Sequence, residues 1–169
     1  MAGLDNVNNI PDEEAKTEFL KCCGSSRWAE KMTTGRPYMG EDELFHFSDK
    51  IWFDMAKEDW LEAFTHHPKI GDIDSLAKKF ADTKQWAEGE QSGVNSASRD
   101  VLQQLADGNQ TYEDKFGYIF IVCATGKTAP EMLAILQERL PNEPETELKV
   151  AMKEQNKITR IRLEKLLNI

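Results

Sequence analysis

The chain has 169 residues, a length typical of one domain that buries a hydrophobic core without disulfides or metals to hold it. Its net charge of −9 argues against nucleic acid and anionic membranes as main partners, because both select a basic surface. The three cysteines lack the spacing of a metal site or a disulfide framework, and no apolar run could span a membrane. The first residues are acidic and unlike a signal peptide, so we expect a cytoplasmic protein with residues 1–169 in a single domain.

Helical periodicity dominates the chain, and alternating patterns typical of strands are nearly absent. Glycine and proline punctuate the pattern, because glycine frees the backbone and the residue before proline resists helix. The pattern predicts helices over residues 11–23, 25–35, 40–55, 57–67, 75–80, 84–105, 130–140 and 145–167. Thr128 and Glu131 form a capping box at the start of the seventh of these, and Gly108 and Gly117 bracket a further polar segment.

The run Tyr118–Thr125 is apolar and rich in β-branched and aromatic residues. Periodicity alone does not separate a buried helix from a lone strand in so short a run. No partner strand is evident, so we interpret the run as a helix. The predicted fold class is therefore all-α, a single compact domain of several helices.

Two of the predicted helices each carry a charged residue within the row of apolar residues along one face. On the helix predicted over 84–105, Glu90 lies four residues from Trp86 and four from Val94, so its carboxylate is expected to face inward. Either the side chain of Glu90 bends outward to solvent and pairs locally, or its buried carboxylate needs a partner or a chemical role.

On the last helix, an inner line of Leu148, Ala151, Gln155, Ile158 and Leu166 has Arg162 at the midpoint of its final gap. Arg160 faces elsewhere and has Glu164 four residues on, an ordinary exposed pair. An inward Arg162 holds a buried carboxylate or binds an anionic or carbonyl-rich ligand, and the pattern leaves both open.

His66 and His67 precede Pro68 at the predicted end of a helix. The helix dipole there favours the imidazolium, whereas a dry site opposes it. Histidine is the natural proton carrier at neutral pH, although two polar residues that close a helix explain the pair equally simply. Adjacent histidines rarely chelate one ion, so we expect no metal site.

Four segments carry motifs in order: HPKIGD (67–72), WAEGEQ (86–91), FGYIFIVCA (116–124) and KITRIRL (157–163). CCGS (22–25), RWA (27–29) and RP (36–37) precede them. With these motifs the chain resembles, over nearly its whole length, the 2-oxo-4-hydroxy-4-carboxy-5-ureidoimidazoline (OHCU) decarboxylase family. The resemblance implies an all-α enzyme, usually a homodimer, that needs no metal or organic cofactor. It would remove the C4 carboxylate of OHCU to give (S)-allantoin, in the last step from urate.

The resemblance also implies roles for single residues. His67 and Glu90 match the catalytic histidine and glutamate of the family. The positions that match substrate contacts are Pro68, Ala87, Gln91, Phe120, Ile121, Val122, Cys123, Ala124 and Arg162, with 120–124 acting through the main chain. Many members carry serine where this chain has Ala87, a loss of one hydrogen bond worth about 1 kcal/mol but of no group that does chemistry.

These roles lead to a mechanistic hypothesis. Arg162 and main-chain N–H groups of 120–124 stabilise the negative charge that develops as CO2 leaves. His67, paired with Glu90, donates the proton whose direction sets the S configuration. The alternative is a non-catalytic all-α module that binds a ligand or serves as a scaffold, which the alanine at position 87 supports.

Overall fold

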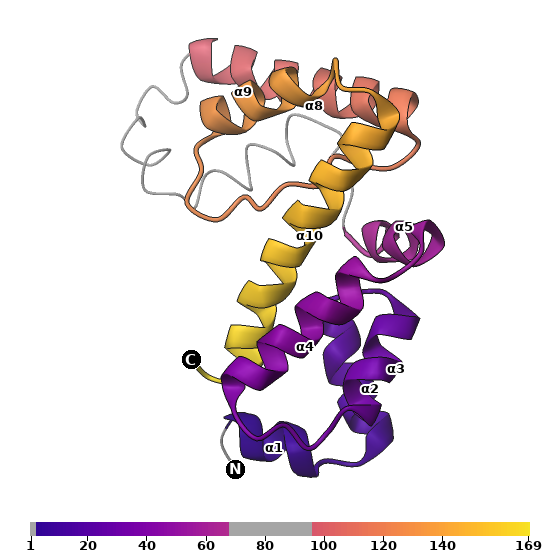
Figure 1. Cartoon of the computed structure of the whole chain (residues 1–169). Coiled ribbons are helices and arrows are strands. Elements are labelled where there is room, and N and C mark those ends of the chain that lie inside the picture. Colours follow the sequence, from indigo (N-terminus) through magenta and orange to yellow (C-terminus); the bar gives the residue numbers. More distant parts are fainter. Residues whose placement is uncertain (1–2, 68–95) are drawn as a thin grey trace. The chain divides into compact units, whose positions relative to one another are not determined.

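The computed structural model describes residues 3–67 and 96–169, and every regular element within them is an α-helix (Figure 1). The helices are α1 (Gly3–Asn9), α2 (Asp12–Cys22), α3 (Ser26–Thr34), α4 (Glu41–Phe53), α5 (Lys57–Thr65), α8 (Ser96–Phe116), α9 (Ala129–Arg139) and α10 (Pro144–Leu166). The all-α prediction is confirmed for these residues. A search of the same residues finds no helix with the length and hydropathy needed to cross a membrane.

Most of the predicted helices are observed, with ends within a few residues of those expected. The short α1 has no counterpart among the predictions. The helix predicted over 75–80 lies outside the described residues, as does the first half of the one predicted over 84–105.

Contacts between residues divide the chain into two compact units. The first contains Met1–His67, Ile121–Cys123 and Ala151–Ile169, and the second contains Pro68–Phe120 and Ala124–Val150. The first unit holds α1 to α5 and the C-terminal part of α10, whereas the second holds α8, α9 and the start of α10. That residues 1–169 act as one domain stays a prediction.

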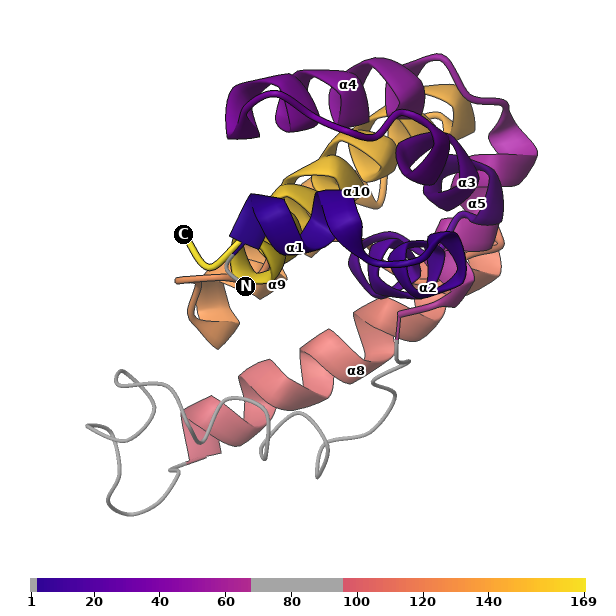
Figure 2. The same ribbon diagram turned by 90° about the horizontal axis from the view of Figure 1, so that it is seen from below.

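Buried aromatic side chains hold the first unit together. Phe19 of α2 and Trp28 of α3 meet edge to face with ring centroids 5.9 Å apart, and both are fully buried. Trp52 of α4 donates its indole N–H to the carbonyl oxygen of Met152 over 2.8 Å, which ties α4 to the C-terminal part of α10 (Figures 1 and 2). A large apolar ring with a satisfied polar atom contributes burial and direction at once.

Arg36 joins the first three helices through its guanidinium. It donates to the carbonyl oxygens of Val7 and Ile10, each over 2.8 Å, and to that of Thr33 over 3.1 Å. Its second terminal nitrogen bonds the carboxylate of Asp12 over 2.6 Å. The guanidinium thus satisfies carbonyl groups at the end of α1 that have no partner within the helix.

In the second unit, α8 and α9 lie side by side (Figure 1). The polar segment expected between Gly108 and Gly117 is instead the continuation of α8, which corrects the helix end predicted at Leu105. A β-carbon at Gly108 would lie 2.5 Å from Cδ2 of the buried Leu136, so glycine at this position lets the two helices approach. The proximity of α9 explains why a residue that disfavours helix is found within one.

The helix predicted over Tyr118–Thr125 is wrong. This segment has no regular structure, because Gly117 takes a φ of +85° and its N–H closes α8 onto the carbonyl oxygen of Glu113 over 2.8 Å. A side chain then replaces a main-chain hydrogen bond of the helix: the N–H of Cys123 donates to the carboxylate of Glu154 over 3.0 Å. Ile121 and Cys123 are buried, which explains the apolar run.

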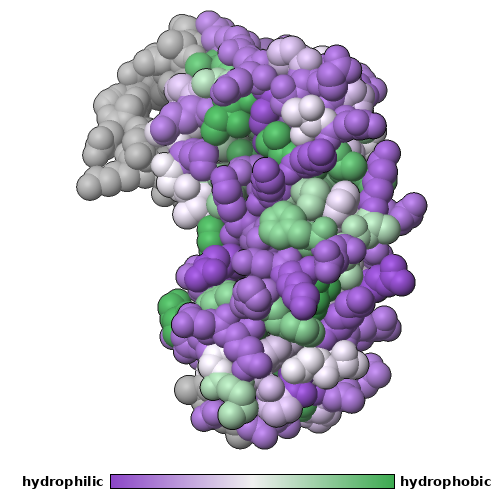
Figure 3. Space-filling view, viewed as in Figure 1, coloured by the Kyte–Doolittle hydropathy of each residue, from purple (hydrophilic) through white to green (hydrophobic). Residues whose placement is uncertain are grey.

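The buried face of α10 is turned slightly from the predicted line. Ala151, Gln155, Thr159 and Leu163 are buried at steps of four residues, whereas Leu148, Ile158 and Leu166 are only partly buried. At the start of α9, Thr128 and Glu131 form the predicted capping box, with both reciprocal hydrogen bonds present. The face shown in Figure 3 is mostly hydrophilic, with hydrophobic side chains in small separate areas.

Candidate functional site

His67 lies two residues beyond the end of α5, close to the helix end that the sequence predicts. The helix ends at Thr65, and the main-chain N–H of His67 still reaches the carbonyl oxygen of Phe64 over 3.4 Å. The turn between α2 and α3 lies against the same end, since a β-carbon at Gly24 would come within 2.4 Å of Cγ of His66. Only glycine leaves room for the imidazole at this point.

The side chain of His67 is held from α10. Its Nε2 lies 2.5 Å from Oε1 of Gln155, and Nε2 of Gln155 donates to the hydroxyl of Thr159 over 3.1 Å. Gln155 is fully buried and Thr159 nearly so, whereas His67 is partly buried. A rigid, dry helix face therefore fixes one edge of an imidazole whose ring remains partly accessible.

Burial lowers the pKa of His67 below its ordinary value of 6.5. The hydrogen bond to Gln155 opposes this shift, whereas the positive charges of Arg162 and His66 add to it. Desolvation thus outweighs the hydrogen bond to Gln155, which favours the charged ring. At neutral pH the ring is neutral, the form that can accept a proton.

Arg160 and Arg162 of α10, two residues apart, differ as predicted. The side chain of Arg160 is 52% exposed, lies 4.0 Å from the carboxylate of Glu164 and stacks over the ring of Phe45 at 4.2 Å. Arg162 is partly buried, and its charge acts on His67, Cys22 and Cys23. Arg162 and His67 are therefore close enough to interact, within the same unit.

The neighbouring thiols are not nucleophiles. Burial raises the pKa of Cys22 to about 12 and that of Cys23 to about 11, so both are protonated at neutral pH. Hydrogen bonds from the main chain of Ser25 and from Thr159 moderate the shift at Cys23. The thiols can serve as hydrogen-bonding and packing groups around Arg162.

The predicted main-chain lining, residues 120–124, divides between the two units. Ile121, Val122 and Cys123 belong to the unit of His67 and Arg162, whereas Phe120 and Ala124 belong to the other. The N–H of Cys123 is engaged by Glu154. The ring of Phe120 lies over the guanidinium of Arg139 at 4.7 Å.

Four of the predicted site residues, Pro68, Ala87, Glu90 and Gln91, lie outside the described residues. Of the others, the structure brings together His67 and Arg162. It adds Gln155, Thr159 and Cys23, whose roles the sequence reading missed. One signal could have revealed Gln155: it is an amide on the inner line of α10, where a buried polar group needs a partner.

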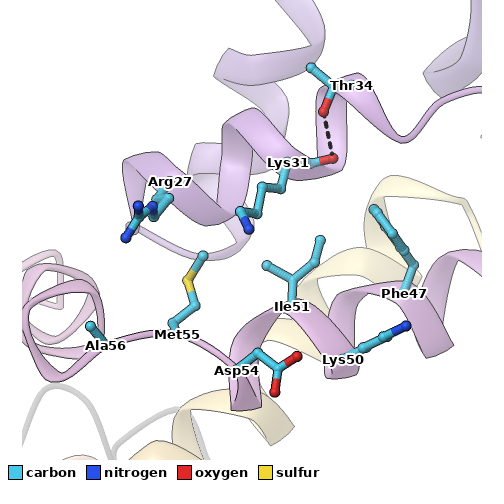
Figure 4. A pocket seen from close by; sticks show the side chains of 9 residues that line it. All are labelled: Arg27, Lys31, Thr34, Phe47, Lys50, Ile51, Asp54, Met55 and Ala56. Carbon is cyan, nitrogen blue, oxygen red and sulfur yellow. Dashed lines mark hydrogen bonds between the residues drawn. The ribbon is translucent and has the colours of Figure 1, made fainter.

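No group of three His, Cys, Asp or Glu side chains that could hold a metal ion occurs among residues 3–67 and 99–169. A separate open pocket of about 600 Å³ lies between α3 and α4, with the ends of Arg27 and Lys31 on one side and Lys50 and Asp54 on the other (Figure 4). None of the predicted site residues lines it.

Comparison of this chain with known proteins identifies its family. The family model described as OHCU decarboxylase matches residues 8–164. The chain belongs to the OHCU decarboxylase family. A crystal structure titled OHCU decarboxylase in the presence of (S)-allantoin superposes with a TM-score of 0.73 at 38% identity, covering 95% of this chain and 100% of that one.

Two curated relatives of this chain differ in how much of their length the chain represents. The uric acid degradation bifunctional protein TTL of Arabidopsis thaliana is 40% identical over 155 residues, which are 91% of this chain but 48% of the plant protein. A 2-oxo-4-hydroxy-4-carboxy-5-ureidoimidazoline decarboxylase of Haloferax volcanii is 25% identical over 161 residues, covering 95% of this chain and 93% of the archaeal protein. The chain thus spans about half of the plant relative and nearly all of the archaeal one.

Proposed function

We propose that this chain decarboxylates OHCU to (S)-allantoin without a cofactor, in the degradation of urate. The observation that carries the proposal is His67, whose side chain Gln155 holds within electrostatic range of Arg162, in a chain of the OHCU decarboxylase family. A proton carrier and a cation that can bind carboxylate or carbonyl oxygens are the two groups this reaction requires.

The reaction needs charge stabilisation followed by directed proton transfer. The bond between C4 and the carboxylate breaks, CO2 leaves, and the electron pair passes into the ring C=N, which takes up one proton from solvent. The resulting enol then loses its hydroxyl proton, and the ring carbon that bears the ureido group gains one. Allantoin results, and the face on which that carbon is protonated decides between its enantiomers.

Each proposed residue has a role in one of these reaction steps. Arg162 binds oxygen atoms of the substrate and offsets the charge that develops as CO2 departs. His67 is neutral at rest, so it first accepts a proton and then donates it to one face of the ring carbon. Glu90 completes the proton-handling pair, and the main chain of 120–124 with Pro68, Ala87 and Gln91 binds the ring and ureido group.

The test is a mutant cycle on freshly prepared OHCU, made by oxidation of urate and hydrolysis. Replacing His67 by Asn is expected to lower kcat about 10²-fold or more, the usual scale of general acid–base help. Glu90→Gln keeps the shape, so a large loss there shows that its charge or basicity matters. The double variant should lose little more than either single one, because groups that act as a unit are non-additive.

Far-UV circular dichroism of each variant controls for folding, since both substitutions remove a polar group rather than core volume. Folded single variants with wild-type turnover would move the chemistry away from His67 and Glu90. Absence of turnover in the wild type would favour the alternative, a non-catalytic module, for which Ala87 in place of serine is the supporting feature.

We also propose that the protein acts as a homodimer in the cytoplasm, with residues 1–169 as one functional domain. The resemblance to OHCU decarboxylases supports the dimer, and three buried cysteines, none of them in a disulfide, fit a reducing compartment. Light scattering coupled to size exclusion measures the mass directly. A particle of one chain's mass at working concentration contradicts the dimer.

A further inference from the structure

A chain of side-chain hydrogen bonds runs from His67 into the core. Nε2 of His67 lies 2.5 Å from Oε1 of Gln155, and Nε2 of Gln155 donates to Oγ1 of Thr159 over 3.1 Å. Thr159 also lowers the pKa of the buried Cys23 thiol, so these two side chains lie close together. Gln155, Thr159 and Cys23 are all at most 2% exposed, so water does not compete for these bonds.

The bonds in this chain have one direction. Nε2 of Gln155 donates to the Thr159 hydroxyl, so Oγ1 of Thr159 is the acceptor in this bond. The amide oxygen of Gln155 then faces His67, and it can only accept.

We propose that Gln155 is a positioning residue that holds His67 as the tautomer with hydrogen on Nε2, leaving Nδ1 as the nitrogen that accepts and donates the proton in the reaction. Thr159 sets the orientation of the Gln155 amide, because its hydroxyl accepts from the amide nitrogen. The inference rests on the proposed function for its catalytic consequence but not for the tautomer itself. A histidine's second nitrogen commonly decides in this way which nitrogen does the chemistry.

The hydrogen bond to Gln155 also restricts the orientation of the His67 ring. Gln155 lies on α10 and His67 at the end of α5, so the bond between them ties two helices of the first unit. The ring can then rotate little about its side-chain bonds, and Nδ1 keeps one direction. Stereospecific protonation requires such a fixed donor.

The tautomer is measured on the full chain without substrate, by long-range ¹H–¹⁵N correlation of ¹⁵N-labelled histidine above the His67 pKa. The chain has three histidines, and His67→Asn identifies the signal of His67 by its loss. We expect a hydrogen-bearing Nε2, with its proton visible because the hydrogen bond slows exchange, and an unprotonated Nδ1. A hydrogen-bearing Nδ1 overturns the proposal.

Variants separate positioning from packing. Gln155→Leu should abolish the visible Nε2 proton and lower kcat about tenfold to a hundredfold, the range for partners that orient a histidine in metal sites, with KM little changed. Gln155→Glu retains an acceptor and should restore the Nε2 proton. Thr159→Val should weaken the signal, because it frees the Gln155 amide to turn.

Thr33→Val is the matched control for Thr159→Val. Thr33 is also buried on a helix, but its hydroxyl bonds only the carbonyl oxygen of Ala29 in its own helix, over 2.8 Å. It should leave both the Nε2 proton and kcat unchanged. Equal effects of the two valine substitutions refute the positioning role.

Failure of this proposal is distinct from failure of the proposed function. Turnover by a wild type whose hydrogen lies on Nδ1 refutes the tautomer and leaves the decarboxylase standing. A hydrogen-bearing Nε2 in a protein that does not turn over OHCU supports the tautomer and refutes the decarboxylase.

Discussion

Replacement of Arg139 by Met should destabilise the protein strongly, although Arg139 is not a predicted site residue. Nε of Arg139 donates to Oε2 of Glu147 over 2.8 Å, and its terminal nitrogen bonds the same oxygen. The hydroxyl of Tyr112 also donates to that oxygen, and Asn142 donates to Oε1 over 3.0 Å. Glu147 is 0% and Arg139 6% exposed, so this ion pair is shielded from water.

The expected magnitude follows from that burial. Met fills much of the volume of the arginine stem but leaves the Glu147 carboxylate buried without its counter-ion, which costs about 3–5 kcal/mol. For a chain of this length each kcal/mol shifts Tm by about 2–4 °C, so Tm should fall by about 6–20 °C. The double variant Arg139→Met, Glu147→Leu removes both charges and should recover much of this loss.

The assay is urea unfolding followed by tryptophan fluorescence, with thermal melts as a second measurement. Lys21→Met provides the matched control, because Lys21 pairs with Glu18 on the surface with 67% of its own side chain exposed, and its loss should cost less than about 1 kcal/mol. A loss below about 1 kcal/mol for Arg139→Met, or a double variant less stable than the single one, refutes the reasoning.

Two further outcomes concern the site. Arg162→Lys keeps the charge but loses the planar guanidinium, so the decrease in kcat/KM should correspond to about 2 kcal/mol of lost transition-state binding. Arg160→Lys, on the exposed face, should change kcat/KM little. Equal losses for the two variants would contradict the inward orientation of Arg162 on α10. Because burial lowers the pKa of His67, the neutral ring persists below pH 6.5, and kcat/KM should decline only as the pH falls through that lowered pKa. A plot of kcat/KM against pH whose acid limb has its midpoint above 6.5 would contradict the burial of His67.

Local signals were read reliably from the sequence. The capping box of Thr128 and Glu131 involves residues three apart, and both its bonds are present. The contrast between Arg160 and Arg162 depends only on helical spacing, and the structure agrees. Such features need no knowledge of distant parts of the chain.

The predictions are wrong where contacts between residues far apart in the sequence determine the local structure. Tyr118–Thr125 is apolar enough for a helix, but Glu154, 31 residues after Cys123, captures a main-chain N–H there. Gly108 looks like a helix end, and the contact with Leu136 explains why it is not. The partnership of His67 and Gln155 joins residues 88 apart, which no local pattern encodes.

The central claim is tested most directly by circular dichroism of freshly generated OHCU with and without the protein, in the presence of a metal chelator. Uncatalysed OHCU decays slowly to racemic allantoin, which has no dichroism. The account predicts rapid loss of OHCU and a signal of the sign of (S)-allantoin that the chelator does not reduce. Racemic product at the uncatalysed rate, or turnover that the chelator abolishes and Zn²⁺ restores, would contradict it.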